Sequence, residues 1–496
     1  MDQQVVVVGA GPVGLLAAIE LALGGVRVVV LERLLEPSLV YKALAIGPLG
    51  IEAMQRRGMG AALDAAEKRT FAAMMHFTQP DAAPTAAAPA TPKIGGHFAG
   101  LALIRTEVQK EPARRGRPVD QQAAEAMLRE RAQALGIDVR RGWEVMEITQ
   151  DEEGVDVAVR TPLGADRLRC AYLVGCDGGR SAVRKLAGIG FPGTPATMTM
   201  YQADVELDHP ERLLPRGFRR TTGGVFAYGF LPGRLMMMDF SGPPQDREAP
   251  VTQAEIDSVL RRVSCADVQV TALKSASRWP DNTRLADTYR QGRILLAGDA
   301  AHIHSPFGGQ GMSLGLGDAA NLGWKLAAVL RAEQPDSLLD TYTAERRPVA
   351  QAVLENTLAQ ASLMRPDPQS GALRDLVTRL MGIDDVNRVF GEMMTGLGAR
   401  YDLASDRDEV GRFIADRPVG QGDATVRLYD VMQDGAGVFL DAGGGTMPVA
   451  PRLHCVTVDA GPSMLVRPDG CIAWAGDASD RAGLDAALRR WFIPAA

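Results

Sequence analysis

The N-terminal end of the chain pairs two short apolar runs with a helical pattern between them. Val5 to Val8 is a β-branched run of strand length, and Leu15 to Leu23 has the apolar spacing of a helix. Arg27 to Leu31 is a second apolar run, which Glu32 ends. Strand, helix and strand in this order predict a βαβ unit. The segment is apolar enough to suggest a membrane span, but its charged residues and repeated glycines argue against one.

Helical and strand patterns follow each other again further along the chain. Apolar spacing predicts a helix over Gln121 to Leu135, closed by Gly136 as a left-handed cap. Three strands are predicted after it, at Val139 to Ile148, Val155 to Arg160 and Leu168 to Cys176. The third of these runs into an Asp-Gly motif, which places that motif at the carboxyl end of a strand.

The next part of the chain has a different pattern. Apolar and polar residues alternate from Tyr201 to Leu207, which predicts an antiparallel strand with one buried and one wet face. Val225 to Leu231 and Arg234 to Phe240 predict a hairpin that turns at Pro232-Gly233. A capping box from Thr252 to Glu255 predicts the start of a helix. This region therefore predicts an antiparallel sheet with helical cover.

These patterns predict three domains. The first comprises residues 1–182 and 280–400, because a buried strand at Arg293 to Ala297 and an apolar helix at Ser313 to Leu330 return the chain to it. The middle domain comprises residues 183–279, with residues 71–103 partly in it, and Pro80 to Pro92 predict an exposed loop.

Residues 411–496 predict a separate small α/β domain. We found no catalytic chemistry in it, so we expect a structural or dimerisation role. Its predicted elements are strands at Val426 to Tyr429, Val438 to Leu440, Cys455 to Val458 and Ser463 to Val466, and a helix at Leu484 to Trp491.

Composition narrows the possible functions of the 496-residue chain. The balance of 54 basic and 60 acidic residues gives a net charge of −6, so we expect neither nucleic-acid nor membrane binding. The basic run from Arg114 to Arg117 is interpreted as a solvated loop, with a contact to an NADPH phosphate as the alternative. Five scattered cysteines indicate reduced core residues, and His302 with His304 lacks a third ligand, so no metal site is expected. We expect a cytoplasmic monomer or homodimer.

Three short motifs carry the candidate chemistry. Gly9-Ala10-Gly11-Pro12-Val13-Gly14 follows the first strand, and Asp177-Gly178 and Gly298-Asp299 follow later strands. In the first motif, Gly9 allows a tight turn, Gly11 admits a pyrophosphate and Gly14 lets helix and strand pack closely. The alternative is a βαβ unit that uses its glycines only for packing.

Glu32 indicates which nucleotide the βαβ unit binds. A carboxylate at this position accepts hydrogen bonds from ribose hydroxyls and repels the 2′-phosphate of NADP. The resident nucleotide is therefore expected to be FAD or NAD.

The motifs together resemble those of the class A flavoprotein aromatic hydroxylases. The resemblance covers about residues 1–400 and includes Gly298-Asp299-Ala300-Ala301-His302 and the stretch from Pro306 to Met312. It is greatest to oxygenases of angucycline and anthracycline polyketides, which have a C-terminal thioredoxin-like domain without redox cysteines. It implies an α/β fold with a Rossmann-like FAD-binding domain, an inserted antiparallel-sheet substrate domain and a small thioredoxin-like α/β domain.

The resemblance also implies the positions that hold non-covalent FAD. Pro306 and Phe307 would lie beside the isoalloxazine, and no residue is identified as a general base. The implied cofactor-binding residues are Gly9, Gly11, Pro12, Val13, Gly14, Glu32, Arg33, Lys42, Gln121, Val145, Asp177, Gly178, Gly298, Asp299, Gly309, Gly311, Met312 and Ser313.

Three positions depart from the family pattern. Lys42 and Leu49 stand where the family usually has arginine, and Ser313 stands where it commonly has asparagine. Lys42 keeps the charge but loses the bidentate fork of arginine, and Leu49 keeps neither. Altered flavin reduction or mobility is the expected consequence.

The resulting hypothesis is an FAD-dependent monooxygenase that hydroxylates a polycyclic aromatic, polyketide-like substrate in antibiotic biosynthesis. The family mechanism implies reduction by NADPH or NADH, reaction with O₂ to a flavin C4a-hydroperoxide, and oxygen transfer. The candidate substrate-binding residues are Phe226, Tyr228, Met236, Met238 and Trp279, with Phe71 and Phe98 as weaker candidates.

Two alternatives remain open at this point. One keeps the fold and changes the reaction to Baeyer–Villiger insertion or the inactivation of a drug. The other is an FAD-binding scaffold or redox-neutral partner, which the three departures favour.

Overall fold

The predicted βαβ unit forms the centre of the N-terminal domain in the computed structural model. Strand β1 (Val5–Val8) leads into helix α1 (Pro12–Leu23), which returns to strand β2 (Val28–Glu32). Strands β2 and β7 (Tyr172–Gly175) lie parallel to β1, one on each side. All four β1 residues are buried, which explains why this strand is apolar at every position.

The structure describes residues 4–37, 43–78, 96–229, 233–420, 422, 425–443, 447–459, 461–477 and 480–493. The predicted loop from Pro80 to Pro92 and the cofactor-binding candidate Lys42 lie outside these residues.

A six-stranded sheet has the order β15-β16-β7-β1-β2-β3. Its other strands are β3 (Asp138–Arg141), β15 (Arg290–Gln291) and β16 (Ile294–Leu296). Neighbouring strands are parallel except for β15 and β16. Helix α4 (Gln121–Ala134) confirms its prediction, and Gly136 beyond it has a left-handed φ of +69°.

Two of the predicted strands are wrong as single elements. The segment Val139 to Ile148 divides at Gly142, whose φ of +75° turns the chain out of β3 and into β4 (Glu144–Gln150). The segment Leu168 to Cys176 also divides, between β6 (Gly164–Cys170) and β7. Strands β4, β5 (Val155–Thr161) and β6 form a separate antiparallel sheet.

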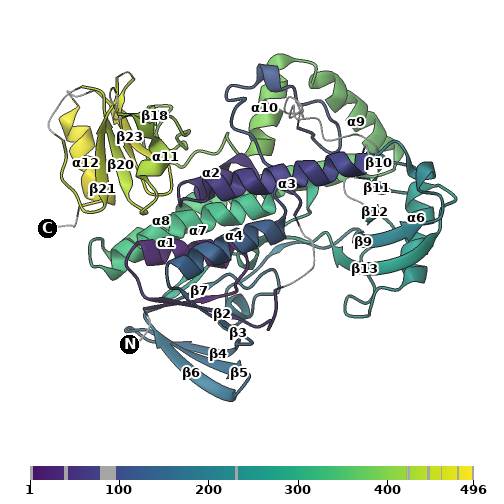
Figure 1. Ribbon diagram of the computed structural model, residues 1–496, viewed down its shortest axis with the longest axis horizontal. Coiled ribbons are helices and arrows are strands. Elements are labelled where there is room, and N and C mark those ends of the chain that lie inside the picture. The colour runs from purple at the N-terminus through teal and green to yellow at the C-terminus, as the bar shows by residue number, and fades with distance from the viewer. Residues whose placement is uncertain are drawn as a thin grey trace.

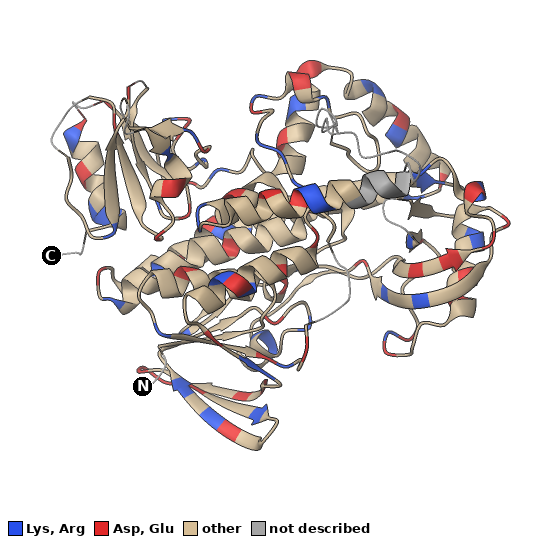
Figure 2. Ribbon diagram, viewed as in Figure 1, with Lys and Arg blue, Asp and Glu red and all other residues tan. Residues whose placement is uncertain are grey.

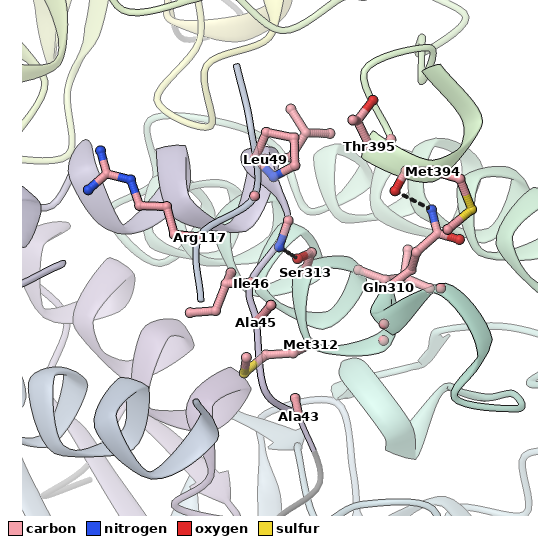
Figure 3. Close-up of a pocket in the computed structure, with 18 of the residues that line it drawn as sticks. Ala43, Ala45, Ile46, Leu49, Arg117, Gln310, Met312, Ser313, Met394 and Thr395 are labelled. Carbon is pink, nitrogen blue, oxygen red and sulfur yellow. Dashed lines mark hydrogen bonds between the residues drawn. The ribbon is translucent and has the colours of Figure 1, made fainter. Parts of the chain in front are cut away.

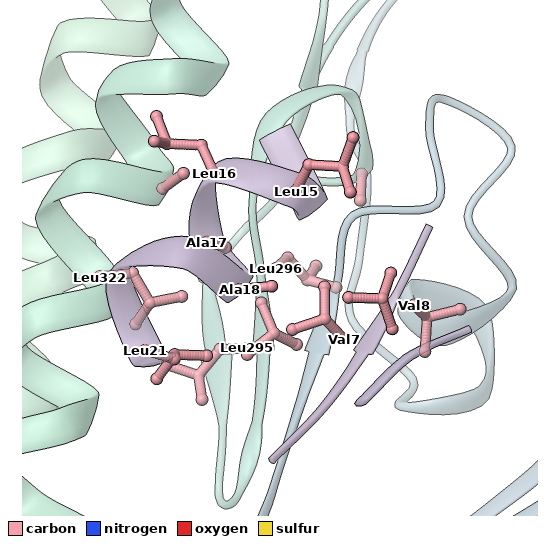
Figure 4. Packing of buried hydrophobic residues seen from close by; sticks show 14 of the residues in the cluster. Val7, Val8, Leu15, Leu16, Ala17, Ala18, Leu21, Leu295, Leu296 and Leu322 are labelled. Atoms are coloured by element: carbon pink, nitrogen blue, oxygen red, sulfur yellow. The ribbon is translucent and has the colours of Figure 1, made fainter. Parts of the chain in front are cut away.

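Helices cover one face of the six-stranded sheet, and the β4–β6 sheet lies on the other side (Figure 1). Helix α7 (Gly311–Leu330) packs against α1. Figure 4 shows the apolar side chains of α1 between those of the sheet and Leu322 of α7. Helix α8 (Asp340–Met364), which the sequence analysis did not identify, continues this layer.

The middle sheet is antiparallel, as predicted, with the order β10-β11-β12-β9-β13. Helix α6 (Gln253–Ser264) covers it, and the Thr252 hydroxyl caps this helix by accepting from the Glu255 N–H. The strands are β9 (Thr199–Leu207), β10 (Gly217–Arg220), β11 (Val225–Tyr228), β12 (Arg234–Asp239) and β13 (Val270–Pro280).

The expectation of one wet face on β9 is wrong for its first half. Residues from Thr199 to Ala203 are all buried, and exposure begins only beyond them. Both faces are covered there, because α6 packs on one side and a second apolar cluster, which includes Met200 and Phe307, packs on the other.

Short elements join these layers. Helix α5 (Ala182–Leu186) follows the Asp177-Gly178 motif. A small sheet of order β17-β14-β8 links the first and middle regions, and its strands are β8 (Gly193–Thr194), β14 (Thr283–Leu285) and β17 (His302–Ile303).

Four further helices surround the junction between the two large sheets. Helices α2 (Pro48–Gln55) and α3 (Gly60–Thr78) precede the middle sheet in sequence, and α9 (Pro368–Leu380) and α10 (Asp384–Thr395) follow it. Figure 1 shows α9 and α10 above α3, with α9 next to the middle sheet.

The C-terminal region forms a four-stranded sheet of order β21-β20-β22-β23 with helix α12 (Arg481–Trp491) packed on it. The strands are β20 (Gly437–Asp441), β21 (Leu453–Thr457), β22 (Ser463–Val466) and β23 (Ile472–Gly476). The predicted strand Val426 to Tyr429 is wrong in its second half. Only β19 (Val426–Arg427) is extended, pairing with β18 (Pro418–Val419), and α11 (Leu428–Val431) begins next.

Buried ion pairs join the C-terminal region to the first domain. Arg467 donates two hydrogen bonds of 2.8 Å to the Glu345 carboxylate of α8, which also accepts one from Lys325 of α7. Arg57 pairs with Glu20 and donates to the backbone oxygens of Met432 and Pro468. These charged groups are almost completely buried, so the two parts pack as one body.

Charged residues of both signs are scattered over the outer surfaces of all layers (Figure 2). In the part of the chain that the structure describes, no helix is both long enough and apolar enough to cross a membrane.

Candidate active site

The first glycine motif forms a turn that a side chain would block. A Cβ on Gly9, whose φ is +107°, would lie 2.4 Å from the Cys176 carbonyl oxygen, and one on Gly14 would lie 1.9 Å from the Gly9 oxygen. A Cβ on Gly11 would meet nothing within 4 Å, which leaves open space beside its backbone. Gly11 begins helix α1, and no side chain caps that helix. The unpaired N–H groups there suit a pyrophosphate.

Glu32 closes this turn from the end of β2. Its carboxylate accepts 2.9 Å hydrogen bonds from the N–H groups of Ala10 and Leu34. Of the other implied cofactor-binding residues, Arg33 is exposed, Gln121 lines the cavity described below, and Val145 is buried in the core.

Asp177 is held by its own loop. Its carboxylate accepts from the Ser181 hydroxyl at 2.5 Å and from the N–H groups of Ala182 and Val183 at 2.6 and 3.1 Å, so it caps α5. Gly178, with a φ of +80°, lines the cavity. Arg184 ties this motif to the next by donating to the Ala300 oxygen at 2.8 Å.

The third motif rests on a buried carboxylate of α7. Asp318 accepts from the Gly298 N–H at 3.0 Å, from Arg346 at 2.7 Å and from the His302 imidazole at 2.6 Å. Burial alone would raise the pKa of Asp318, but Arg346 and His302 hold it below its usual value. The adjacent Asp299 lines the cavity. Asp318 is thus a positioning residue, which sequence reasoning missed.

A cavity of about 1180 Å³ connects the three motifs to the middle sheet. Helix α7 begins at its wall with no side-chain cap, so its first N–H groups and positive dipole end face the open space. The sequence-predicted residues from this loop and helix that line the cavity are Pro306, Phe307, Gly309, Gly311, Met312 and Ser313.

Figure 3 shows the start of α7 beside the chain segment that runs from Ala43 towards Leu49. Ser313, one of the departures from the family pattern, accepts a 2.7 Å hydrogen bond from the Gly47 N–H, which holds that segment against α7. Gln310 donates to the Met393 and Met394 oxygens of α10. Leu49, another departure, lines the cavity.

The strand register shows which face of the middle sheet meets the cavity. Met236 and Met238 line it, as expected of substrate-binding candidates. Phe226 and Tyr228 occupy the other face and pack with the α6 cluster, so the structure does not bring them to the cavity. The sequence pattern could not show this, because a strand that is covered on both faces is apolar at every position, so the pattern does not indicate which side chains share a face.

The other aromatic candidates differ in position. Phe71 lines the cavity, whereas Trp279 and Phe98 belong to the apolar cluster behind its wall. Gln202, Phe218 and His97 are among the lining residues that sequence reasoning missed.

The basic run from Arg114 to Arg117 is only in part the solvated loop that was expected, because Arg115 and Gly116 are exposed but Arg114 and Arg117 are not. Arg114 is nearly buried and donates two 2.7 Å hydrogen bonds to Glu52 of α2. Arg115 and Arg117 pair with acidic residues of α3. The run also lines the cavity. The sequence did not indicate these acidic partners, because a run of charged residues looks the same whether it faces solvent or pairs with distant helices.

The cysteines and histidines have structural surroundings. Cys170 and Cys471 are buried, but Cys265 is exposed, which contradicts its assignment to the core. His302 is bound to Asp318, and among the described residues no cluster of three potential ligands could hold a metal ion.

The cavity fits a dinucleotide on structural grounds alone. An open backbone surface at Gly11, two uncapped helix starts and the Asp299 side chain all border one continuous space. These are the donors and acceptors that a pyrophosphate and sugar hydroxyls need.

Comparisons with known proteins give the family. Residues 2–357 match a family described as an FAD binding domain, and residues 407–495 match the C-terminal domain of aromatic-ring hydroxylases. The 12-dehydrotetracycline 5-monooxygenase/anhydrotetracycline 6-monooxygenase of Streptomyces rimosus subsp. rimosus is 39% identical, with 100% of both chains covered. The rifampicin monooxygenase of Streptomyces venezuelae is 38% identical, with 98% of both covered.

Comparison of the fold with solved structures gives the same family. The crystal structure of an aromatic hydroxylase from angucycline biosynthesis matches with a TM-score of 0.85 at 32% identity over 100% of both chains. The resemblance drawn from the three motifs is therefore confirmed, as are the fold class and the FAD cofactor. The chain belongs to the FAD-dependent aromatic-ring hydroxylases.

Proposed function

We propose that this chain is a monooxygenase that hydroxylates a polycyclic aromatic, polyketide-like substrate, with NADPH or NADH as reductant and O₂ as the source of oxygen. The observation that supports it is the shape of the cavity. One continuous space of about 1180 Å³ runs from the glycine motifs to an apolar sheet face that carries Met236, Met238 and Phe218. A flat apolar ligand can therefore lie against the sheet beside the cofactor.

The protein's own groups have distinct parts in this proposal. Bound FAD supplies the redox chemistry that activates O₂. Gly11 and the start of α1 would hold its pyrophosphate, Asp299 its sugar hydroxyls, and Glu32 the turn that shapes the site. The N-terminus of α7 favours negative charge beside it. Pro306, Phe307 and the sheet exclude water from the reacting centre.

We also propose that the three-domain division of residues 1–182 with 280–400, 183–279 and 411–496 applies to this chain. The separate apolar clusters of the middle and C-terminal regions support it.

The experiment follows NADPH oxidation and oxygen uptake by the purified holoenzyme. The chain should be yellow, and polycyclic phenols should accelerate NADPH oxidation and gain one oxygen atom by mass. FAD that stays bound but is reduced by neither NADPH nor NADH would reject the monooxygenase in favour of the redox-neutral alternative.

A second candidate is the inactivation of a drug by oxygenation. The 38% identity to a rifampicin monooxygenase favours it. Mass analysis of rifampicin incubated with the enzyme, NADPH and O₂ separates the two, because only this candidate gives an oxygenated antibiotic.

A further inference from the structure

One row of side chains crosses the middle sheet and faces the cavity. The strand register places Phe218 opposite Ala227, Ala227 opposite Met236, and Met236 opposite Gln202. Residues directly opposite each other in antiparallel strands point to the same face. Phe218, Met236 and Gln202 of this row line the cavity. Three strand spacings separate Phe218 from Gln202, which is about 14 Å.

Gln202 is a polar side chain in an apolar wall. It is 6% exposed, and its amide is neither hydrogen-bonded to a described residue nor among the fully buried side-chain atoms without a partner, so it remains open to the cavity. An amide that a bound ring covers without giving it a partner costs free energy, so such a group usually has a ligand or water to bind. The neighbouring Tyr201 points to the other face, where its hydroxyl bonds with Glu255 at 3.1 Å. Gln202 therefore differs from Tyr201, whose hydroxyl has a partner within the protein.

His97 occupies the opposite end of the same row. Its ring lies over Phe218, with 5.7 Å between the ring centroids, and it lines the cavity. Its buried Nδ1 has no hydrogen-bond partner. Burial lowers the pKa of His97, and no charged side chain among the described residues opposes this effect. The imidazole is consequently neutral near pH 7 and can hydrogen-bond a ring hydroxyl.

We propose that Gln202 and His97 bind oxygen substituents at the two ends of an elongated fused-ring substrate, which lies along the row over Met236. This assignment rests on the proposed function. The apolar row supplies contact with the ring faces, while the two polar ends fix how far and in which direction the substrate is inserted. Gln202 and His97 thus determine two properties. They select substrates with oxygen substituents at both ends, and they set which ring position faces the cofactor.

The physical basis is the cost of leaving both groups unpaired. A ring that carries hydroxyls at both ends satisfies Gln202 and His97, whereas the bare ring buries them without partners. Discrimination should therefore exceed about tenfold and should depend on each end separately.

The test measures binding to the FAD-loaded enzyme through the change in flavin absorbance. The probes are 2,6-dihydroxyanthraquinone, with hydroxyls at opposite ends, and anthraquinone, with none at its ends. The variants are Gln202→Met, His97→Phe and the control Tyr201→Phe, which removes a hydroxyl from the opposite face of the same strand. Gln202→Leu and His97→Leu replace any variant that fails to retain FAD.

The wild-type enzyme should prefer the dihydroxy ring by at least about tenfold, and each site variant should lose most of this preference while keeping its affinity for anthraquinone. Tyr201→Phe should keep the preference. If either site variant keeps a preference within about twofold of the wild-type value, the proposed roles of Gln202 and His97 are overturned. If the wild-type enzyme binds neither ring, the proposed substrate class is wrong and the inference falls with it.

Discussion

At the scale of single residues, the buried charges behind the site determine its shape. Among the residues that the structure describes, Asp318 is the acidic side chain that pairs with Arg346, and both side chains are almost completely buried. Asp318→Asn would leave that guanidinium without an anion and would place an amide donor against His302. We expect a loss of about 3–5 kcal/mol in the free energy of unfolding, measured with urea.

The matched control is Asp64→Asn, because Asp64 pairs with Arg117 while 59% of its side chain is exposed. It should change stability little, since exposed pairs contribute little. An Asp318→Asn enzyme as stable as the control would show that the buried network does not support the fold.

The same carboxylate predicts a pH dependence. The folded-state pKa of Asp318 lies below its ordinary value of 3.8. The ionised carboxylate therefore adds to the free energy of unfolding above pH 3.8, and this stabilisation is lost as the pH falls through the folded-state pKa. The stability difference between wild type and Asp318→Asn should therefore shrink in acid. A difference that stays constant from pH 7 to pH 3 would contradict this sign.

Glu32 gives a prediction about the cofactor. Its carboxylate orders the turn through Ala10 and would also meet a ribose, so Glu32→Ala should weaken FAD binding by about 1.5–3 kcal/mol. Titration of the apoenzyme with FAD measures this, with Glu36→Ala as the control, because Glu36 is an exposed acidic residue shortly after Glu32. Unchanged affinity would remove Glu32 from the cofactor site.

At the scale of elements, one hydroxyl joins α2 to α7. Ser313→Ala removes the acceptor of the Gly47 N–H, so the segment before α2 should open more easily by about 1 kcal/mol. Hydrogen exchange at the Gly47 amide should become several times faster. Ser313→Thr keeps the hydroxyl and should retain most of the protection, whereas equal exchange in wild type and Ser313→Ala would contradict the role of this contact.

Elements were predicted correctly from the sequence where local residues mark their ends. They were predicted poorly where a strand of one sheet is followed directly by a strand of another. The glycine motif and β-branched run specified β1, α1 and β2, because turn and packing both depend on local residues. Val139 to Ile148 looked continuous because the break depends on one left-handed residue, Gly142. Phe226 was assigned to the substrate because burial on both faces hides which way a strand's side chains point.

At the scale of the whole molecule, the attachment of the C-terminal region could not be predicted from the sequence. Arg467 and Glu345 are 122 residues apart, and each looks like an ordinary surface charge in its own segment. In the fold, Arg467 is fully buried among Trp324, Tyr401 and Trp491. Such long-range pairing depends on tertiary structure, which local patterns cannot show.

The C-terminal region also contributes residues to the cavity wall. Arg412, Phe413 and Asp469 from the C-terminal part line it together with the residues of α7. Asp469 bonds with Asn321 of α7 at 3.1 Å, and its backbone oxygen accepts from Arg56 of α2 at 2.8 Å. The expected structural or dimerisation role is therefore too narrow, because this region supplies part of the cavity wall.

The last prediction concerns Arg467→Ala. The variant would leave Glu345 and Asp469 buried with fewer cations and would remove the guanidinium packed on three aromatic rings, so we expect a loss of about 3–5 kcal/mol by urea unfolding. Arg490→Ala is the control, because Arg490 belongs to the same domain and contacts Trp491 from the exposed side. Since α7 carries both this network and the cofactor wall, FAD should also be released at a lower temperature in Arg467→Ala, as followed by flavin fluorescence. If Arg467→Ala unfolds and releases FAD as the control does, the C-terminal region is attached only loosely and the cavity wall does not depend on it.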